Sequence, residues 1–174
     1  MENLQQDLDA ILITGPTASG KSALALRLAQ KRNGVVINAD SMQVYDTLRI
    51  LTARPAEEEM ADVPHHLYGH VPSTRAYSSG DWLRDVDRLL GVVRDEGKLP
   101  IFVGGTGLYF KALTGGLSDM PEIPQDIRCA VRLRLKQEGP DSLYAELARQ
   151  DAAEAQGQEQ KDGQRIVRAL EVLQ

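Results

Sequence analysis

The stretch that decides the fold is Ala10-Ile11-Leu12-Ile13-Thr14-Gly15-Pro16-Thr17-Ala18-Ser19-Gly20-Lys21-Ser22. Its last eight residues match the pattern G-x-x-x-x-G-K-[ST] without a departure. The apolar run 10–14 before the motif predicts a fully buried strand, and the apolar spacing over residues 22–31 predicts a helix after it. A strand, this loop and a helix in succession are typical of a phosphate-binding P-loop.

The spacing of the loop has a mechanical reason. Its glycines permit backbone angles that turn several N–H groups inward, and the following helix adds its positive N-terminal end. Lys21 can then reach the outer phosphates, and the Ser22 hydroxyl can ligate a Mg²⁺ shared with phosphate oxygens. We therefore expect Mg²⁺ as the cofactor and a diphosphate or triphosphate bound by Gly15, Pro16, Thr17, Ala18, Ser19, Gly20, Lys21 and Ser22.

Strands and helices alternate through the first two thirds of the chain. Residues 35–37 and 99–103 are further apolar runs that predict buried strands, and the spacing over 82–96 predicts an amphipathic helix. This alternation predicts an α/β fold, a P-loop NTPase-like parallel sheet flanked by helices. Residues 45–75 show no clean period, so we expect a long irregular connection with one short helix near residues 57–61.

The pattern changes after Gly115-Gly116. Pro121 and Pro124 predict a rigid passage, and three helical patterns follow, over residues 125–138, 141–149 and 162–173. We therefore expect a P-loop α/β core over residues 1–118 and a helical appendage over residues 119–174. The last periodic pattern has no capping residue after it, which favours a chain that is incomplete relative to its full fold.

Composition excludes several classes. Hydrophobic residues make up 42% and charged residues 26%, as in ordinary globular proteins, and the single Cys129 excludes a disulfide framework. No apolar run approaches the roughly 20 residues of a membrane span, and residues 1–9 are acidic, unlike a targeting peptide. We expect a cytoplasmic protein with no membrane partner. The net charge of −5 requires any nucleic-acid partner to be held by a local basic surface.

Asp40 is the candidate catalytic carboxylate. The strand that ends at Val103 runs into Gly104-Gly105-Thr106, so it lacks the acidic residue that holds the metal in hydrolysing P-loop proteins. Asp40 instead follows the second strand, at the sheet edge where open α/β sheets bind ligands, and this favours a transferase. Asp40 could accept a proton, support a metal through water, or cap a helix. Thr106 could likewise cap a helix or contact a ligand.

Five blocks occur in order along the chain. They are the P-loop motif, Asp40-Ser41-Met42-Gln43-Val44-Tyr45, Pro64-His65-His66-Leu67, the segment from Val103 to Tyr109, and the segment from Gln164 to Val172. Together they resemble the tRNA dimethylallyltransferases. The resemblance implies transfer of a dimethylallyl group from dimethylallyl diphosphate to N6 of the adenine next to the anticodon in tRNA, with diphosphate released. It also implies that the helical appendage is an incomplete tRNA-binding insertion.

The resemblance also implies residue roles. The implied catalytic residues are Asp40, which resembles the general base, Thr106 and Lys21, and Gln43 carries an amide that can pair with an adenine edge. The implied tRNA contacts are Asp40, Ser41, Met42, Gln43, Thr106, Arg128, Gln164, Arg165, Ile166, Val167 and Arg168. The expected partners are tRNA and dimethylallyl diphosphate, with nucleotide binding, including ATP, as a general property of P-loops. We expect a monomer.

Two alternatives stay open from the residues themselves. One is another P-loop transferase, either a small-molecule kinase or an isopentenyltransferase that acts on free adenine nucleotide. The other is a nucleotide-dependent binding or regulatory module without chemistry of its own. His65 and His66 lack the second ligand pair that a zinc site requires, so we expect them to organise the long loop.

Overall fold

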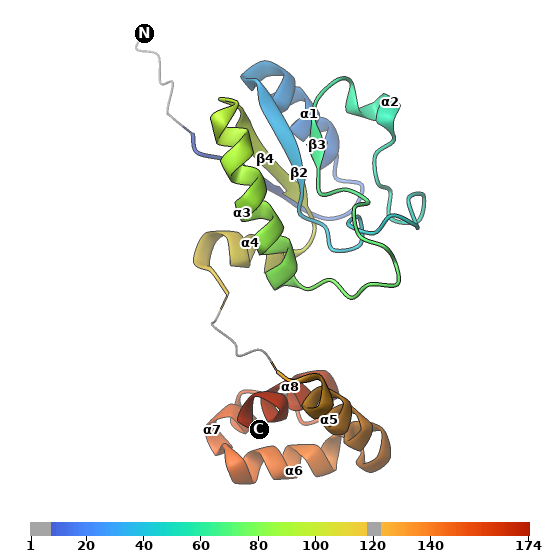
Figure 1. The fold of residues 1–174 in the computed structure, drawn as a ribbon, viewed down its shortest axis with the longest axis vertical. Helices are drawn as coiled ribbons and strands as arrows, with labels where there is room; N and C mark the ends of the chain where they lie inside the picture. Colours follow the sequence, from blue (N-terminus) through green and yellow to red (C-terminus); the bar gives the residue numbers. More distant parts are fainter. Residues whose placement is uncertain (1–7, 118–122) are drawn as a thin grey trace. The chain divides into compact units, whose positions relative to one another are not determined.

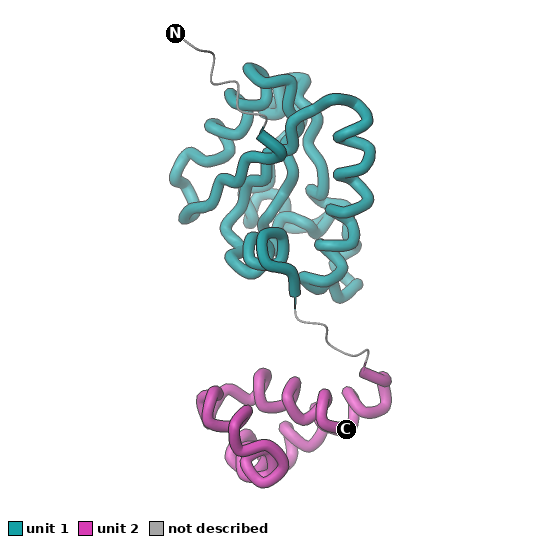
Figure 2. Tube along the Cα trace, turned by 90° about the vertical axis from the view of Figure 1, so that its left-hand side faces the viewer, with its two compact units in different colours: residues 1–117 teal, residues 118–174 magenta. Residues whose placement is uncertain are grey.

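The computed structural model describes residues 8–117 and 123–174, which belong to two units (Figure 1). Unit 1 comprises Met1–Leu117 and unit 2 comprises Ser118–Gln174 (Figure 2). The division falls one residue before the boundary that the sequence suggests. Pro121, expected in a rigid passage between the two parts, lies outside the described residues.

Unit 1 is built on a four-stranded sheet in the order β1-β4-β2-β3. The strands are β1 (Ile11–Thr14), β2 (Gly34–Asn38), β3 (His65–His66) and β4 (Leu99–Gly104). Every pairing between them is parallel. The central strands β2 and β4 are buried along nearly their whole length, which explains why both read as continuous apolar runs. The predicted P-loop NTPase-like α/β fold is confirmed.

The two outer strands differ from expectation. The prediction of a fully buried β1 is wrong, because exposure alternates along it and Leu12 is 41% exposed. Within the described residues β1 pairs only with β4, so it lies at an edge of the sheet. The opposite edge is β3, which the sequence does not predict because His65-His66 is short and polar. Its pairing with Val36 and Ile37 of β2 holds it in the sheet.

Helices cover both faces of the sheet (Figure 1). They are α1 (Lys21–Arg32), α3 (Ser79–Asp95) and α4 (Gly107–Gly115). The short α2 (Glu57–Met60) lies in the connection between β2 and β3 and has no buried residue. On one face α1 packs Ala25 and Ala29 against Val36 and Ile101. On the other face α3 and α4 enclose a core of aromatic and branched side chains: Val35, Ile37, Trp82, Val86, Phe102 and Tyr109. Successive residues of β2 thus point to opposite layers.

Unit 2 contains only helices among its described residues, 123–174. They are α5 (Gln125–Glu138), α6 (Pro140–Gln150), α7 (Ala152–Gln156) and α8 (Gly163–Leu173). Val131, Leu143, Leu147, Ile166 and Leu170 form its buried core. The short α7 was not predicted; its N-terminus is capped by Asp151, which accepts hydrogen bonds from two backbone N–H groups. Among residues 8–117 and 123–174, no helix combines the length and apolar character that crossing a bilayer requires.

Candidate functional site

The P-loop joins the end of β1 to the start of α1. Gly20 precedes the helix with a φ of 79°, in the left-handed region that glycine adopts without strain, and Ala18 has a φ of 61°. A helix that starts directly after the loop places its unpaired N–H groups at the loop. The Lys21 ammonium donates a 2.9 Å hydrogen bond to the carbonyl of Pro16. The lysine therefore lies back across the loop, within reach of a group that the loop would hold.

A cavity of about 500 Å³ opens beside this loop. Residues 17–23 form one wall, and the remaining lining residues include Gln43, Thr52, Glu59, His65, Tyr68 and the strand-end carboxylate Asp40. The volume falls in the range of small-molecule binding sites. Asp40 and the P-loop, which the sequence relates only by position along two strands, thus share one cavity at the carboxyl edge of the sheet.

Asp40 is half-buried and held at several atoms. Its backbone N–H donates to Oδ1 of Asn38 at 2.9 Å, and its own Oδ1 accepts a 2.9 Å hydrogen bond from the backbone N–H of Met42. Within residues 8–117 no donor bonds its second oxygen, Oδ2. A side chain at Gly105 would lie 3.6 Å from Oδ2, so the glycine keeps that side of the carboxylate open. Oδ2 is therefore available to accept a proton.

Thr106 occupies the N-cap position of α4, but its side chain does not cap the helix. Its hydroxyl oxygen accepts a 2.9 Å hydrogen bond from the backbone N–H of Ser41 and donates to the Ser41 hydroxyl at 3.2 Å. Thr106 is therefore the N-cap residue by its backbone position, while its side chain bonds Ser41. Thr106 ties the loop after β4 to the segment that follows Asp40.

Gln43 reaches the cavity with part of its amide already engaged. Its Nε2 donates to the carbonyls of Thr52 and Ala53, at 2.8 and 3.3 Å. Adenine pairing through that nitrogen would have to break these bonds, so in this conformation only the amide oxygen is free to accept. Met42, next to it, is 51% exposed. The segment 41–43 thus offers one exposed apolar side chain and one hydrogen-bond acceptor.

Sequence reasoning missed two residues of the site. Asn38 is fully buried at the end of β2 and bonds Asp40, and a polar residue closing an apolar run was the available signal. Tyr68 lines the cavity after β3, and no local pattern points to it. Burial, and then the negative charge of Asp40, raise the pKa of the Tyr68 hydroxyl well above its usual value. Tyr68 therefore stays protonated and can donate a hydrogen bond into the cavity.

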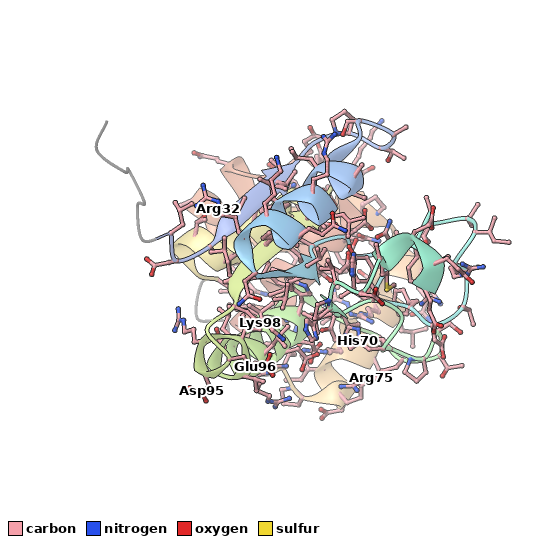
Figure 3. The ribbon with its side chains drawn as sticks, turned by 90° about the horizontal axis from the view of Figure 1, so that it is seen from above. Arg32, His70, Arg75, Asp95, Glu96 and Lys98 are labelled. Atoms are coloured by element: carbon pink, nitrogen blue, oxygen red, sulfur yellow. The ribbon has the colours of Figure 1, made fainter. Side chains whose placement is uncertain are left out.

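The edge of the sheet at which the strands begin, opposite their carboxyl ends, carries charges of both signs. Figure 3 labels Arg32 and Lys98 together with Asp95 and Glu96, and Lys98 pairs with Glu96 at 2.7 Å between Nζ and Oε2. Basic and acidic side chains are therefore balanced at that edge. An anion is favoured instead at the P-loop, where backbone N–H groups and Lys21 converge.

The residues present fit a Mg²⁺ ion that is shared with phosphate. In the part of the chain that the structure describes, no group of three or more His, Cys, Asp or Glu side chains is placed to hold a metal ion. A Mg²⁺ bound mainly through phosphate oxygens and water needs only one or two protein oxygens. The Ser22 hydroxyl, which lines the cavity, can supply such an oxygen.

In unit 2, two of the expected tRNA contacts face inward. Ile166 and Val167 are 0% and 5% exposed and belong to the core of the unit, so their side chains do not form a binding surface. Gln164 and Arg165 are exposed on the same helix. The alternation follows from the helical period, which turns two residues of each turn toward the core.

The two arginines that remain among the expected tRNA contacts, Arg128 and Arg168, are both half-buried. Arg168 lies 3.4 Å from Glu171, which is buried and also pairs with Arg132 at 3.4 Å. Arg128 is half-buried, and its Nε has no hydrogen-bond partner within residues 8–117 and 123–174. Glu171 thus holds two arginines at the surface of the unit while neutralising only one of their charges.

A strand, a P-loop and a helix on a parallel sheet covered on both faces define a P-loop NTPase-like α/β protein. Family models narrow this class. The model described as IPP transferase matches residues 43–174, and the model described as isopentenyl transferase matches residues 8–68. The chain belongs to the IPP transferase family.

Curated relatives agree with this assignment. The tRNA dimethylallyltransferase of Rhizobium johnstonii is 70% identical over 99% of this chain, and that of Agrobacterium fabrum is 69% identical over 100% of it. The chain spans 58% of the length of each of these relatives.

Solved structures agree as well. A eukaryotic dimethylallyltransferase acting on tRNA has a TM-score of 0.80 and 34% identity, covering 94% of this chain and 40% of its own. The tRNA isopentenylpyrophosphate transferase of Bacillus halodurans has a TM-score of 0.63 and 33% identity, covering 95% of this chain and 55% of its own.

Proposed function

We propose that this chain transfers a dimethylallyl group from dimethylallyl diphosphate to N6 of the adenine next to the anticodon in tRNA, and that it releases diphosphate. The observation that carries the proposal is the single cavity lined by both the P-loop and Asp40. One wall suits a leaving diphosphate, and the other presents a carboxylate oxygen to an incoming nitrogen. Membership of the IPP transferase family supports the same reaction.

The reaction exchanges one bond for another. The C1–O bond between the dimethylallyl group and the diphosphate breaks, a bond forms between C1 and N6 of adenine, and N6 loses one proton. Negative charge grows on the leaving diphosphate, where the loop N–H groups and Lys21 stabilise it. The Lys21 ammonium donates one N–H to the Pro16 carbonyl, and its two other N–H groups are free to bond charged phosphate oxygens. Mg²⁺ bound near Ser22 would add positive charge to the leaving group.

Asp40 orients and deprotonates the nucleophile, which is the N6 amine of adenine. An exocyclic amine is a poor nucleophile, so orientation contributes as much as basicity. Oδ1 is held by Met42, which leaves Oδ2 to orient the amine and take its proton. The protonated Tyr68 hydroxyl is a further donor in the same cavity. In this proposal the exposed Gln164 and Arg165 of unit 2 contact tRNA, with Arg165 released from Asp162, which lies 3.3 Å from it.

The decisive experiment is mass analysis of an anticodon stem-loop after incubation with this chain, Mg²⁺ and dimethylallyl diphosphate. A gain of one dimethylallyl unit on the target adenine supports the proposal. Parallel reactions offer ATP as donor, or free adenine nucleotide as acceptor. Phosphate transfer from ATP without prenylation, or prenylation of the nucleotide alone, contradicts it.

The proposal also places the protein in the cytoplasm as a monomer, and light scattering on a sizing column checks the monomer.

Two variants separate binding from chemistry. Asp40→Asn should lower product formation by at least about 100-fold, the usual contribution of a general base, while calorimetry with diphosphate and Mg²⁺ shows unchanged binding. Lys21→Ala should weaken diphosphate binding by about 10- to 100-fold, because it removes a charge-assisted hydrogen bond. The exposed Asp87→Asn and Lys31→Ala are matched controls that should change neither quantity. An active Asp40→Asn variant would remove Asp40 from the mechanism.

A further inference from the structure

The amide of Asn38 lies at the end of β2 with no exposed surface. Burial of a polar side chain is costly unless its hydrogen-bonding groups find partners. Here they do: Oδ1 accepts from the backbone N–H of Asp40 at 2.9 Å, and Nδ2 donates to the carbonyls of Asp40 and Leu67, each at 3.0 Å. The amide is therefore a fixed junction between two segments that are 29 residues apart.

Two of these bonds act on Asp40 itself. Because they hold its N–H and its C=O, they fix the peptide planes on both sides of its Cα and so the direction of its side chain. The hydrogen bond from Met42 to Oδ1 then sets the rotation of the carboxylate. Together these three bonds leave Oδ2 as the free oxygen.

The third bond of the Asn38 amide, to the Leu67 carbonyl, acts on the segment that leads into Tyr68. Leu67 directly precedes Tyr68, which lines the cavity with Asp40. The same amide thus holds the backbone at Asp40 and the backbone that leads into Tyr68 at a fixed distance from each other. No other side chain among residues 8–117 bonds both segments.

Asn38 is itself firmly anchored. Its carbonyl accepts a buried 2.9 Å hydrogen bond from the indole Nε1 of Trp82, and its backbone is in register with Val103 of β4. Trp82 stacks on Tyr109, with ring centroids 4.3 Å apart and planes inclined by 12°. The junction therefore rests on α3, α4 and the central pair of strands.

We propose that Asn38 is a positioning residue, whose amide fixes Asp40 and the Leu67–Tyr68 segment so that Oδ2 meets the reacting amine. This inference rests on the proposed function. It assigns Asn38 no contact with substrate, so it predicts a defect in turnover and not in donor binding. Misplacement of a reacting group by about 1 Å can cost about 100-fold in rate.

Asn38→Asp tests the inference with a side chain of the same size. It keeps an oxygen that accepts from Asp40 N–H, but it places a second oxygen against the carbonyls of Asp40 and Leu67. We expect kcat to fall at least about 10-fold, while the KM for the donor and the diphosphate affinity stay within about twofold. Asn33→Asp, the same chemical change at an exposed position that ends α1, is the control and should leave kcat unchanged.

A second comparison separates positioning from a general structural role. If Asn38 acts through Asp40, adding Asn38→Asp to an Asp40→Asn chain should lower the residual rate by less than about twofold, because the affected group is already absent. A structural defect would instead lower the rate again and weaken diphosphate binding with it. Trp82 fluorescence checks folding. Should the charged variant not fold, the neutral Asn38→Ser, which also loses the bond to Leu67, carries the same comparisons.

Each outcome has a meaning. An unchanged kcat in the folded Asn38 variant, or equal losses with and without Asp40, overturns the inference and leaves the proposed function standing. Absence of prenylated product from the unaltered chain overturns the proposed function, and this inference with it. A kcat defect that depends on Asp40, with intact donor binding, supports it.

Discussion

Replacing Gly104 by alanine should destabilise unit 1 at the point where Asp40 leaves the sheet. A Cβ at Gly104 would lie 2.0 Å from the oxygen and 2.1 Å from the carbon of the Ala39 carbonyl, and 2.7 Å from the Asp40 nitrogen. Comfortable separations between such atoms are roughly 3.5 Å, so β2 and β4 would have to move apart by about 1 Å or more. All three contacts are with backbone, which cannot turn aside.

The cost follows from this geometry. Overpacking in a core typically costs about 1–3 kcal/mol. Two backbone hydrogen bonds cross the same point, from Ala39 N–H to the Val103 carbonyl at 2.8 Å and from Thr106 N–H to the Ala39 carbonyl at 3.2 Å, and each contributes about 1 kcal/mol net. We expect the free energy of unfolding of unit 1 to fall by about 2–4 kcal/mol.

Urea denaturation followed by tryptophan fluorescence measures this loss. Trp82 is the single tryptophan of the chain and is buried in unit 1, so its signal reports on that unit. The midpoint should fall by about 1–2 M urea, given slopes of about 1–3 kcal/mol per M. Gly91→Ala is the matched control: Gly91 is exposed in α3 with no atom near its Cβ position, so alanine should stabilise by about 0.5–1 kcal/mol. Equal midpoints for the two variants would refute the reasoning.

Three further predictions concern other contacts. Trp82→Phe should cost unit 1 about 1–3 kcal/mol, because the buried Asn38 carbonyl loses its donor; circular dichroism in urea checks this. Burial lowers the pKa of the His66 imidazole below its usual value of 6.5. The stability that neutral His66 contributes is therefore fully present above pH 6.5 and is lost as the pH falls from 6.5 through the lowered pKa. His66→Gln should therefore reduce the fall in urea midpoint between pH 7 and pH 5, measured by fluorescence, and an identical fall would contradict it. Glu146→Gln should cost unit 2 less than about 1 kcal/mol by calorimetry, because it removes one of the two carboxylates that Arg134 contacts in a solvent-accessible cluster.

Much of the fold followed from patterns within short windows. β2 and β4 were predictable because both of their faces are buried, which requires apolar residues at every position. Helix α3 was predictable from its apolar spacing and from Ser78, whose side chain accepts a hydrogen bond from the N–H of Asp81. β3 was not, because two histidines enter the sheet only through pairing with β2.

Some features of the candidate site were likewise predictable from the sequence, and others were not. The P-loop was recognisable because its function depends on backbone conformation, which eight adjacent residues specify. The carboxyl-edge position of Asp40 was also predictable, since parallel strands end at one edge of a sheet. The partners of Thr106 and Gln43 were not, because Ser41 lies 65 residues from Thr106 and a carbonyl acceptor carries no sequence signature.

The sequence by itself determined a P-loop at the end of a strand, a parallel α/β sheet, a helical second part and a carboxylate at the ligand edge. These features depend on hydrophobic period and on glycine conformation, both of which act over a few residues. Only the tertiary structure decided that Asn38 joins Asp40 to Leu67, and that Ile166 and Val167 face a core and not a partner. Such contacts join segments distant in the chain, and packing of the whole unit selects them.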